Sequence, residues 1–146
     1  MANAGSGPEE ANRAMTTPDE LPVLDRDHLS AMTGGDADLA AEVIEIFREQ
    51  AAIWGRLLTA QEPVTSWTDA AHSLKGAALG IGAIRLAKLC TRAETLGRSH
   101  APSQTEAAVV LSDVRAGLND ALEAAAVAAH ELAGSAGFSA SKDPNS

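Results

Sequence analysis

Aromatic side chains and cysteine are scarce in this chain. Aromatic residues make up 3% of its 146 residues and tyrosine is absent, whereas alanine supplies much of the apolar content. Strands favour aromatic and β-branched residues, so this composition favours closely packed helices. The single cysteine, Cys90, excludes an internal disulfide, and its apolar neighbours indicate a packing role rather than a reactive thiol.

Positive charge and long apolar runs are scarce as well. Eleven Lys and Arg residues stand against 20 Asp and Glu, which gives a net charge of −9 and an isoelectric point near 4.8. Such a surface repels a phosphate backbone, so we expect no nucleic-acid binding, and a partner with a basic rim suits it better. No apolar run approaches about 18 residues, and no signal peptide is recognisable. We therefore expect a cytoplasmic protein that makes no membrane contact.

The composition divides the chain into three parts. Residues 1–21 are rich in Gly, Pro, Ser, Thr and acidic residues without an apolar period, and residues 133–146 have a similar small and polar character. We expect both segments to be disordered. Between them, residues 22–132 have enough apolar content for one domain, with no strand-like alternation and no internal repeat.

Helical periodicity predicts five helices in the central part. A short one is expected at about 25–32, capped by Asp25 and ended by Thr33-Gly34-Gly35. Four longer ones are expected at about 36–60, 65–82, 83–96 and 103–132. The expected N-terminal caps are Asp36, Ser66 with Asp69 in a capping box, and Ser103. Gly80 and Gly82 are expected to end or bend the third helix, and Gly97 is expected to be the C-cap of the fourth. The inward residues of the second helix are expected to be Leu39, Val43, Ile46, Phe47, Gln50, Ile53 or Trp54, and Leu57. The pattern predicts an all-α fold, an antiparallel four-helix bundle with a short extra N-terminal helix.

The third of the five expected helices, at about 65–82, presents a histidine to solvent. At 100° per residue, five polar, glycine or isolated apolar residues lie within about 60° of His72, and the other apolar residues form a separate buried stripe. The residues beside His72 are Thr68, Asp69, Lys75, Gly76 and Leu79. The helix therefore holds a titratable nucleophile in water, next to a cation and a residue without a side chain.

The segment AHSLKGAALGIGAIRLAKLCTRAE, from Ala71 to Glu94, resembles the signature of histidine-containing phosphotransfer (HPt) domains. The family pattern is Ala-His-x-Leu-Lys-Gly and two small residues, then Gly-Ala ten and eleven residues after the histidine, then Leu-x-x-Leu-Cys and a Glu. The chain matches it at His72, Leu74, Lys75, Gly76, Ala77, Ala78, Gly82, Ala83, Leu86, Leu89, Cys90 and Glu94. The stretch from Leu24 to Leu29, the Gly-Gly-Asp-Ala-Asp that follows and a helix containing Phe47 are also similar. The resemblance covers about residues 23–130.

The resemblance implies a role for each residue around the histidine. His72 would be the phosphoacceptor, Lys75 the cation beside the phosphoryl group, and Gly76 the gap that gives a partner access. The chemistry of these residue types agrees, because a neutral imidazole can attack an acyl phosphate and a lysine at i+3 can reach the phosphoryl oxygens. A glycine inside a helix costs up to about 1 kcal/mol relative to alanine, so its place beside His72 suggests a steric reason.

The candidates for partner binding lie around that histidine and on the next helix. They are Thr68, Asp69, Leu79, Arg85 and Lys88. Leu79 could contact a hydrophobic partner surface or be one of the scattered exposed leucines that are common on proteins. Asp69 could hydrogen-bond the imidazole or favour the helix N-terminus, and the second interpretation is preferred.

The resemblance also implies partners and excludes cofactors. No phosphate-binding glycine loop follows a strand, so the chain is expected to be no enzyme and to receive its phosphoryl group from a sensor (hybrid) histidine kinase or a receiver domain. It would pass the group to the receiver domain of a response regulator. The other histidines, His28, His100 and His130, lack the spacing of a metal site. We expect a monomer with no cofactor, and Mg²⁺ in the acidic pocket of the partner receiver.

Two alternatives from other classes stay open. The chain could be a phosphate-independent adaptor on the same scaffold, which binds a kinase or receiver and inhibits it. A pure binder, however, would need neither His72 nor Lys75. It could also be the dimerisation and phosphotransfer domain of a sensor kinase, but that class would have a proline a few residues after the histidine and an attached ATPase domain.

Overall fold

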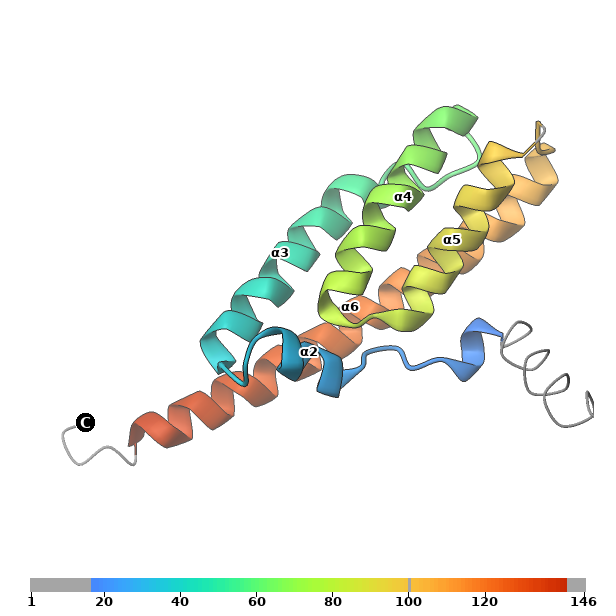
Figure 1. Cartoon of the computed structure of the whole chain (residues 1–146). Helices are drawn as coiled ribbons and strands as arrows, with labels where there is room; N and C mark the ends of the chain where they lie inside the picture. Colours follow the sequence, from blue (N-terminus) through green and yellow to red (C-terminus); the bar gives the residue numbers. More distant parts are fainter. Residues whose placement is uncertain (1–16, 100, 142–146) are drawn as a thin grey trace, which may run out of the picture.

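The protein is described by a computed structural model over residues 17–99 and 101–141, of which residues 135–141 are described by their backbone only. The described part is all-helical, with no strand (Figure 1). Its elements are the 3₁₀ turn η1 (Pro18–Glu20) and the helices α2 (Arg26–Met32), α3 (Ala37–Gly55), α4 (Val64–Ile81), α5 (Ile84–Arg98) and α6 (Gln104–Ser141). The expected all-α class is confirmed.

The four long helices form a bundle in which each packs against two others. The packed pairs are α3 with α4, α4 with α5, α5 with α6, and α6 with α3. Short connections join consecutive helices, so neighbours along the chain run antiparallel (Figure 1). The largest fully buried side chains belong to Trp67, Phe47, Ile44, Leu58 and Leu74. Alanines fill much of the remaining core, which lets the helices approach closely.

The short helix α2 closes one end of the bundle beneath α4. The Asp25 side chain accepts a hydrogen bond from the His28 backbone N–H at 3.0 Å and caps α2, as the sequence predicts. Gly82 ends α4 with φ +84, a left-handed conformation that glycine adopts freely. The Asp25 backbone N–H donates to the Gly82 carbonyl at 2.8 Å, so a hydrogen bond joins the N-cap of α2 to the C-cap of α4.

Helix α3 is rotated relative to the prediction. Asp36 caps it as expected, but its buried stripe is Ala40, Ile44, Phe47 and Ala51. Three residues expected to face inward are instead among the exposed large apolar side chains: Leu39 is 42% exposed, Ile46 55% and Ile53 47%. The helix ends at Gly55, five residues before the expected end. The inward assignment is therefore wrong at Leu39 and Ile46 and right at Phe47. Of the alternatives Ile53 and Trp54, Trp54 packs against the core, as do the predicted Val43 and Leu57.

The limits of α4 and α5 differ from the prediction for physical reasons. Helix α4 begins at Val64, with Pro63 as N-cap and no side-chain cap, so the capping box expected from Ser66 and Asp69 is wrong. Proline fixes the backbone before a helix without a side-chain donor or acceptor. Gly80 lies inside α4, and only Gly82 ends it.

Gly97 lies inside α5 and does not cap it. A Cβ atom at Gly97 would lie 1.9 Å from Thr68 Oγ1 and 3.0 Å from Trp67 Cζ3 on α4. The glycine therefore permits the close approach of α4 and α5 rather than ending α5, which continues to Arg98.

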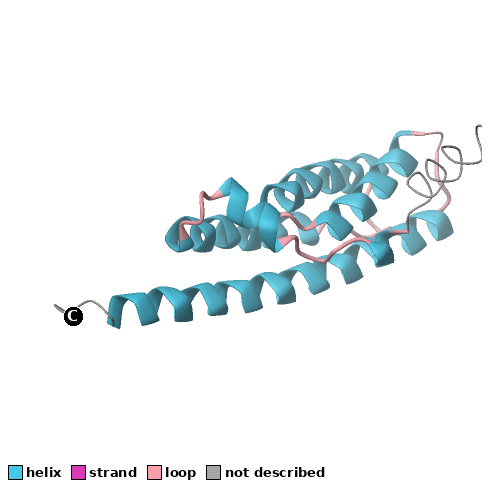
Figure 2. Cartoon of the chain, turned by 60° about the horizontal axis from the view of Figure 1, so that its bottom comes forward, coloured by secondary structure: helices cyan, strands magenta, loops and turns pink. Residues whose placement is uncertain are grey.

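Both ends of the bundle are more structured than expected. Ser103 caps α6, as predicted, and Glu106 completes a reciprocal capping box that was not predicted. Helix α6 continues to Ser141, nine residues past its expected end. It projects beyond the bundle (Figure 2). Residues 17–21, expected to be disordered, include η1 and pack on α5. The rest of the predicted disorder, residues 1–16 and 142–146, lies outside the described residues.

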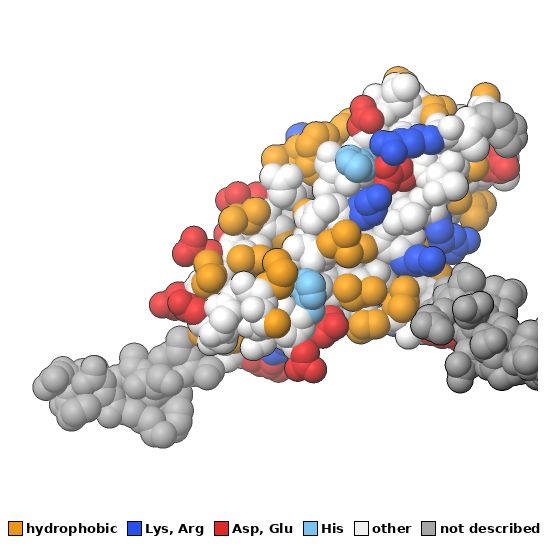
Figure 3. Space-filling model, in the orientation of Figure 1, with side chains coloured by type: hydrophobic (Ala, Val, Ile, Leu, Met, Phe, Trp, Pro, Cys, Tyr) orange, Lys and Arg blue, Asp and Glu red, His pale blue; other side chains and the backbone are white. Residues whose placement is uncertain are grey.

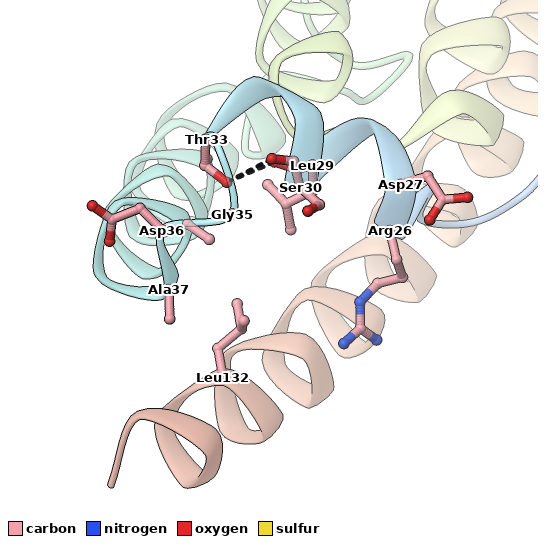
Figure 4. A pocket seen from close by; sticks show the side chains of 10 residues that line it. Arg26, Asp27, Leu29, Ser30, Thr33, Gly35, Asp36, Ala37 and Leu132 are labelled. Carbon is pink, nitrogen blue, oxygen red and sulfur yellow. Dashed lines mark hydrogen bonds between the residues drawn. The ribbon is translucent and has the colours of Figure 1, made fainter. Parts of the chain in front are cut away.

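A pocket of about 300 Å³ lies where α2, the start of α3 and α6 meet (Figure 4). Its walls include Leu29, Ala40 and Leu132, with Arg26 and Asp36 among the polar lining residues. The pocket contains no residue of the His72 stripe, so it is separate from the candidate site. None of the described helices has both the length and the apolar character needed to cross a membrane.

Candidate functional site

His72 lies in the middle of α4 with its imidazole 58% exposed. Its Nδ1 atom is 2.8 Å from Oε2 of Glu94, which comes from the neighbouring helix α5. An ionised carboxylate only accepts hydrogen bonds, so Nδ1 carries the proton and donates it to Glu94. The lone pair of the neutral ring is therefore on Nε2. The exposed histidine is held by one nitrogen and is nucleophilic at the other.

Glu94 is a buried carboxylate on which three donors converge. Its side chain is 7% exposed and accepts from His72 Nδ1 at 2.8 Å, Lys75 Nζ at 2.8 Å and Arg98 Nη1 at 2.7 Å. The hydrogen bond from Lys75 is the main cause that lowers the pKa of Glu94; the bond from His72 and the charges of Lys75 and Arg98 lower it further, and burial opposes them. The carboxylate therefore stays ionised at neutral pH, and its burial is compensated by charged hydrogen bonds.

Two cations accompany this single carboxylate. Lys75 is 28% exposed and binds Oε1, whereas Arg98 is 58% exposed and shares Oε2 with His72. The formal charges of Lys75, Arg98 and Glu94 sum to +1 while His72 is neutral. A histidine on this face lies beside acidic and basic side chains (Figure 3). The site thus offers an anion a local positive charge on a protein that is acidic as a whole.

Gly76 lies one turn after His72 and is exposed. A Cβ atom at this position would have nothing within 4 Å, so no packing contact inside the chain requires the glycine. A glycine in a helix interior is destabilising by roughly 0.5–1 kcal/mol relative to alanine. The open space next to His72 is consistent with the predicted role of Gly76 in access.

The predicted partner-binding residues do not form one surface. Leu79 is 47% exposed and Asp69 is exposed. Thr68 is a correction, because its side chain faces Gly97 between α4 and α5 and the residue is only 5% exposed. Its hydroxyl has no hydrogen-bond partner among the described residues. Helical spacing alone placed Thr68 beside His72, but α5 covers that flank of α4.

Arg85 and Lys88 differ in their availability. Lys88 is partly exposed on α5. The Arg85 guanidinium instead donates to the Leu21 and Asp19 carbonyls, each at 3.0 Å, and holds the N-terminal segment on α5. Arg85 is thus used within the fold.

Asp69 neither orients the imidazole nor caps the helix. Glu94 bonds His72 Nδ1, the nitrogen that Asp69 would have had to reach, and Asp69 lies beyond the first turn of α4. The preferred interpretation of Asp69 as a helix-end residue is therefore wrong.

Sequence reasoning missed what Glu94 and Arg98 do. Glu94 lies 22 residues from His72 on another helix, so helical spacing around His72 does not find it. The only available signal was the Glu that closes the family signature. Arg98, four residues after Glu94, is a normal i,i+4 ion-pair position, which predicts the contact but not its link to His72.

The remaining reactive groups of the described part do not contribute to the site. Cys90 is fully buried, and burial raises the pKa of its thiol to about 12, so it remains a protonated packing residue. No group of three or more His, Cys, Asp or Glu side chains among the described residues could hold a metal ion.

Comparison with known proteins identifies the family. A family model described as the Hpt domain matches residues 37–116, which include all of α3, α4 and α5. The chain belongs to the HPt family. The structure of the histidine phosphotransferase ShpA from Caulobacter crescentus is similar, with a TM-score of 0.63 and 38% identity over 77% of this chain and 95% of that one.

A second HPt relative is much longer than this chain. The sensor protein GacS of Pseudomonas syringae pv. syringae is 31% identical over 112 residues, which are 73% of this chain but 12% of that protein. The chain therefore corresponds to a small part of this sensor protein. The HPt family and the phosphotransferase relative together support a phosphorelay role for the chain.

Proposed function

We propose that the chain is a phosphorelay intermediate that accepts a phosphoryl group on His72 Nε2 and passes it to an aspartate of a receiver domain. The single observation that carries the proposal is the hydrogen bond of 2.8 Å between His72 Nδ1 and the ionised Glu94. This hydrogen bond holds the imidazole at Nδ1 and leaves Nε2, the proposed nucleophile, available. Membership of the HPt family supports the assignment.

The proposed transfer is an in-line substitution at phosphorus. The Nε2 lone pair forms the N–P bond while the bond from phosphorus to the donor oxygen breaks, and the donor leaves as a carboxylate. The ring becomes cationic during the attack because Nδ1 keeps its proton. Glu94 stabilises that charge, as a carboxylate does for other nucleophile-activating histidines. The reverse sequence returns the group to a receiver aspartate.

Lys75 and Arg98 are proposed to stabilise the phosphoryl oxygens. Both lie on Glu94 and so are positioned beside His72 before any phosphate arrives. Preorganised cations cost little rearrangement during the reaction. Gly76 leaves room for the incoming acyl phosphate.

The proposed partners are receiver domains of response regulators and a sensor or hybrid histidine kinase. The chain itself is proposed to act without a cofactor, with Mg²⁺ held in the acidic pocket of the receiver. We further propose a monomer that acts in the cytoplasm as a relay rather than as an enzyme. The adaptor alternative has less support, because a site that serves only for binding has no use for a carboxylate that fixes the tautomer of His72.

Chemical labelling tests the proposal. The protein is labelled with phosphoramidate, the reagent is removed, and purified receiver domains are added with Mg²⁺ while label is followed on both proteins. We expect label on His72, lost in His72→Gln, and rapid transfer to at least one receiver. Lys75→Ala should slow the transfer, whereas Arg48→Ala, which removes an exposed cation of α3 paired with Glu45, should leave the rate of transfer from His72 nearly unchanged. Labelled His72 that no receiver discharges, despite measurable binding, would contradict the proposal and favour the adaptor.

A further inference from the structure

A surface depression of about 320 Å³ lies between the C-terminal end of α3 and the first half of α6. These two helices form the flank of the bundle opposite α4 and α5, which carry His72 and Glu94. The floor of the depression is apolar and includes the buried side chains of Ala51 and Leu118. The depression is therefore separate from the phosphoryl-transfer site.

The depression is hollow because α3 has only small residues where it meets α6. Ala51, Ala52 and Gly55 line it from the α3 side. A Cβ atom at Gly55 would lie 3.2 Å from Leu118 Cδ2, so the glycine permits the close approach of the helices and leaves the floor uncovered. The shape of the depression thus follows from the residues of α3 that face Leu118.

Three polar side chains from two helices border this floor. They are Arg56, directly after α3, and Arg115 and Asn119, which lie one turn apart on α6. All three residues are exposed. One nitrogen of Arg115 donates to the Leu58 carbonyl, which fixes the guanidinium and leaves most of its five N–H donors available. Two guanidinium groups and an amide therefore surround one apolar floor.

No acceptor inside the chain accounts for Arg56. The last carbonyls of α3, those of Trp54 and Gly55, already accept backbone N–H groups at 3.0 and 3.2 Å. Among the side chains that the structure describes, no carboxylate forms a salt bridge with Arg56 or Arg115. A cation at the end of a helix offsets the partial charge there. That effect explains one arginine at this end, but not a second arginine and an amide beside the same hollow.

The nearby acidic residues lie on other sides of their helices or farther along them. At 100° per residue, Asp113 and Asp120 are turned about 140–160° away from Arg115 around α6. On α3, Glu49 is seven residues before Arg56, which is about 10 Å along the helix. The depression therefore carries two positive charges without an adjacent negative one, on a chain whose net charge is −9.

We infer that this depression binds a small phosphate monoester, with its phosphate on Arg56 and Arg115 and its organic group on the apolar floor. Guanidinium forks match phosphate oxygens in geometry, and two of them balance a group whose charge is about −1.5 to −2 at neutral pH. A carboxylate would neutralise only one of the two cations. The volume lies at the lower end of the range of about 300–1,000 Å³ for small-molecule pockets, so the organic group is small. The inference does not depend on the proposed function, because the depression shares no residue with that site.

The first test is a titration of the full chain with phenyl phosphate, followed by nitrogen–proton correlation spectra. We expect saturable shifts at residues 51–58 and 115–119. Arg56→Gln should raise the dissociation constant by roughly fivefold or more, since it removes a charged hydrogen-bond donor. The matched control is Arg92→Gln, which removes an exposed arginine of α5 and should change the constant less than about twofold. Shifts confined to the surroundings of His72 and Arg98, or equal effects of the two variants, would overturn the inference.

The second test places a negative charge in the depression without removing any of its polar groups. Ala52→Glu is compared with Ala133→Glu, an exposed position 18 residues after Arg115 on α6, about 27 Å along the helix. Glutamate is a good helix former, so both variants should fold. Ala52→Glu should weaken phenyl phosphate binding by roughly tenfold or more and Ala133→Glu by less than about twofold, because only the first puts like charges together. Unweakened binding in Ala52→Glu would place the ligand elsewhere and reject the site.

Two further ligands test the chemical class. Inorganic phosphate lacks the organic group and benzoate lacks the second charge, so each should bind the wild type more weakly than phenyl phosphate by roughly threefold or more. Inorganic phosphate that binds as tightly as phenyl phosphate would show that the apolar floor contributes nothing and would overturn the monoester assignment. Benzoate that binds as tightly would assign the depression to carboxylates instead.

Discussion

At the scale of single residues, Glu94 links the parts of the site. One carboxylate fixes the tautomer of His72 and holds both Lys75 and Arg98 in place. The sequence predicted His72, Lys75 and Gly76 because they fall within one turn and a half of a single helix. It could not predict the function of Glu94, because the contact depends on how α5 packs on α4. Contacts between helices follow from packing, which local spacing does not describe.

Substituting Glu94 should change the orientation and tautomer of the His72 ring while the histidine itself remains. In Glu94→Ala the imidazole loses its acceptor, and we expect transfer to slow by roughly 10–100-fold, by analogy with the loss of a carboxylate that orients a metal-binding histidine. Glu94→Gln keeps an acceptor oxygen but not the charge and should lie between. Nitrogen–proton correlation spectra of the ring provide a readout that general destabilisation would not change: a single Nδ1–H tautomer in the wild type and a mixture in Glu94→Ala. An unchanged tautomer in the alanine variant would show that Glu94 does not set it.

At the scale of elements, α3 shows why an apolar pattern can give the wrong face. Two stripes run along it: Ala40, Ile44, Phe47 and Ala51 are buried, and the larger Leu39, Ile46 and Ile53 are exposed. A ranking by hydrophobicity prefers the second stripe, because isoleucine and leucine bury more area than alanine. The bundle instead places alanines where helices approach closely. The number and order of the helices followed from caps and periodicity, whereas the rotation of α3 depended on the space left by its neighbours.

The glycines of α4 and α5 should respond to alanine in opposite directions. Gly80→Ala meets open space, so we expect the free energy of unfolding to rise by up to about 1 kcal/mol. Gly97→Ala places a methyl group against Thr68 and Trp67 and should lower it by about 1–3 kcal/mol, the usual cost of overpacking. Urea unfolding followed by circular dichroism measures both. Stabilisation by Gly97→Ala would mean that α4 and α5 can move apart without cost.

At the scale of the whole molecule, a strongly acidic protein contains a small positive region. The net charge of −9 predicts a partner with a basic rim, but this average conceals the excess of cations around His72. The ends of the fold were the least predictable part. Composition suggested that both were disordered, yet α6 reaches Ser141 and η1 packs on α5. Small and polar residues are compatible with a helix once a capped, packed helix already extends to their start.

The buried Glu94 also makes the stability of the whole bundle depend on acid. Its pKa in the folded state is below the ordinary value of 4.5, chiefly because Lys75 donates a hydrogen bond to it. The unfolded chain therefore binds the proton more readily than the folded one. The stabilisation from Glu94 is fully present above pH 4.5 and is lost as the pH falls through the lower, folded-state pKa. Glu94→Gln lacks this titration. We expect the difference in unfolding free energy between wild type and Glu94→Gln to shift against the wild type as the pH falls below 4.5, as measured by urea unfolding at each pH. A difference that stays constant down to pH 3 would mean that Glu94 has the same proton affinity in both states, and that its three partners do not hold it as the distances indicate.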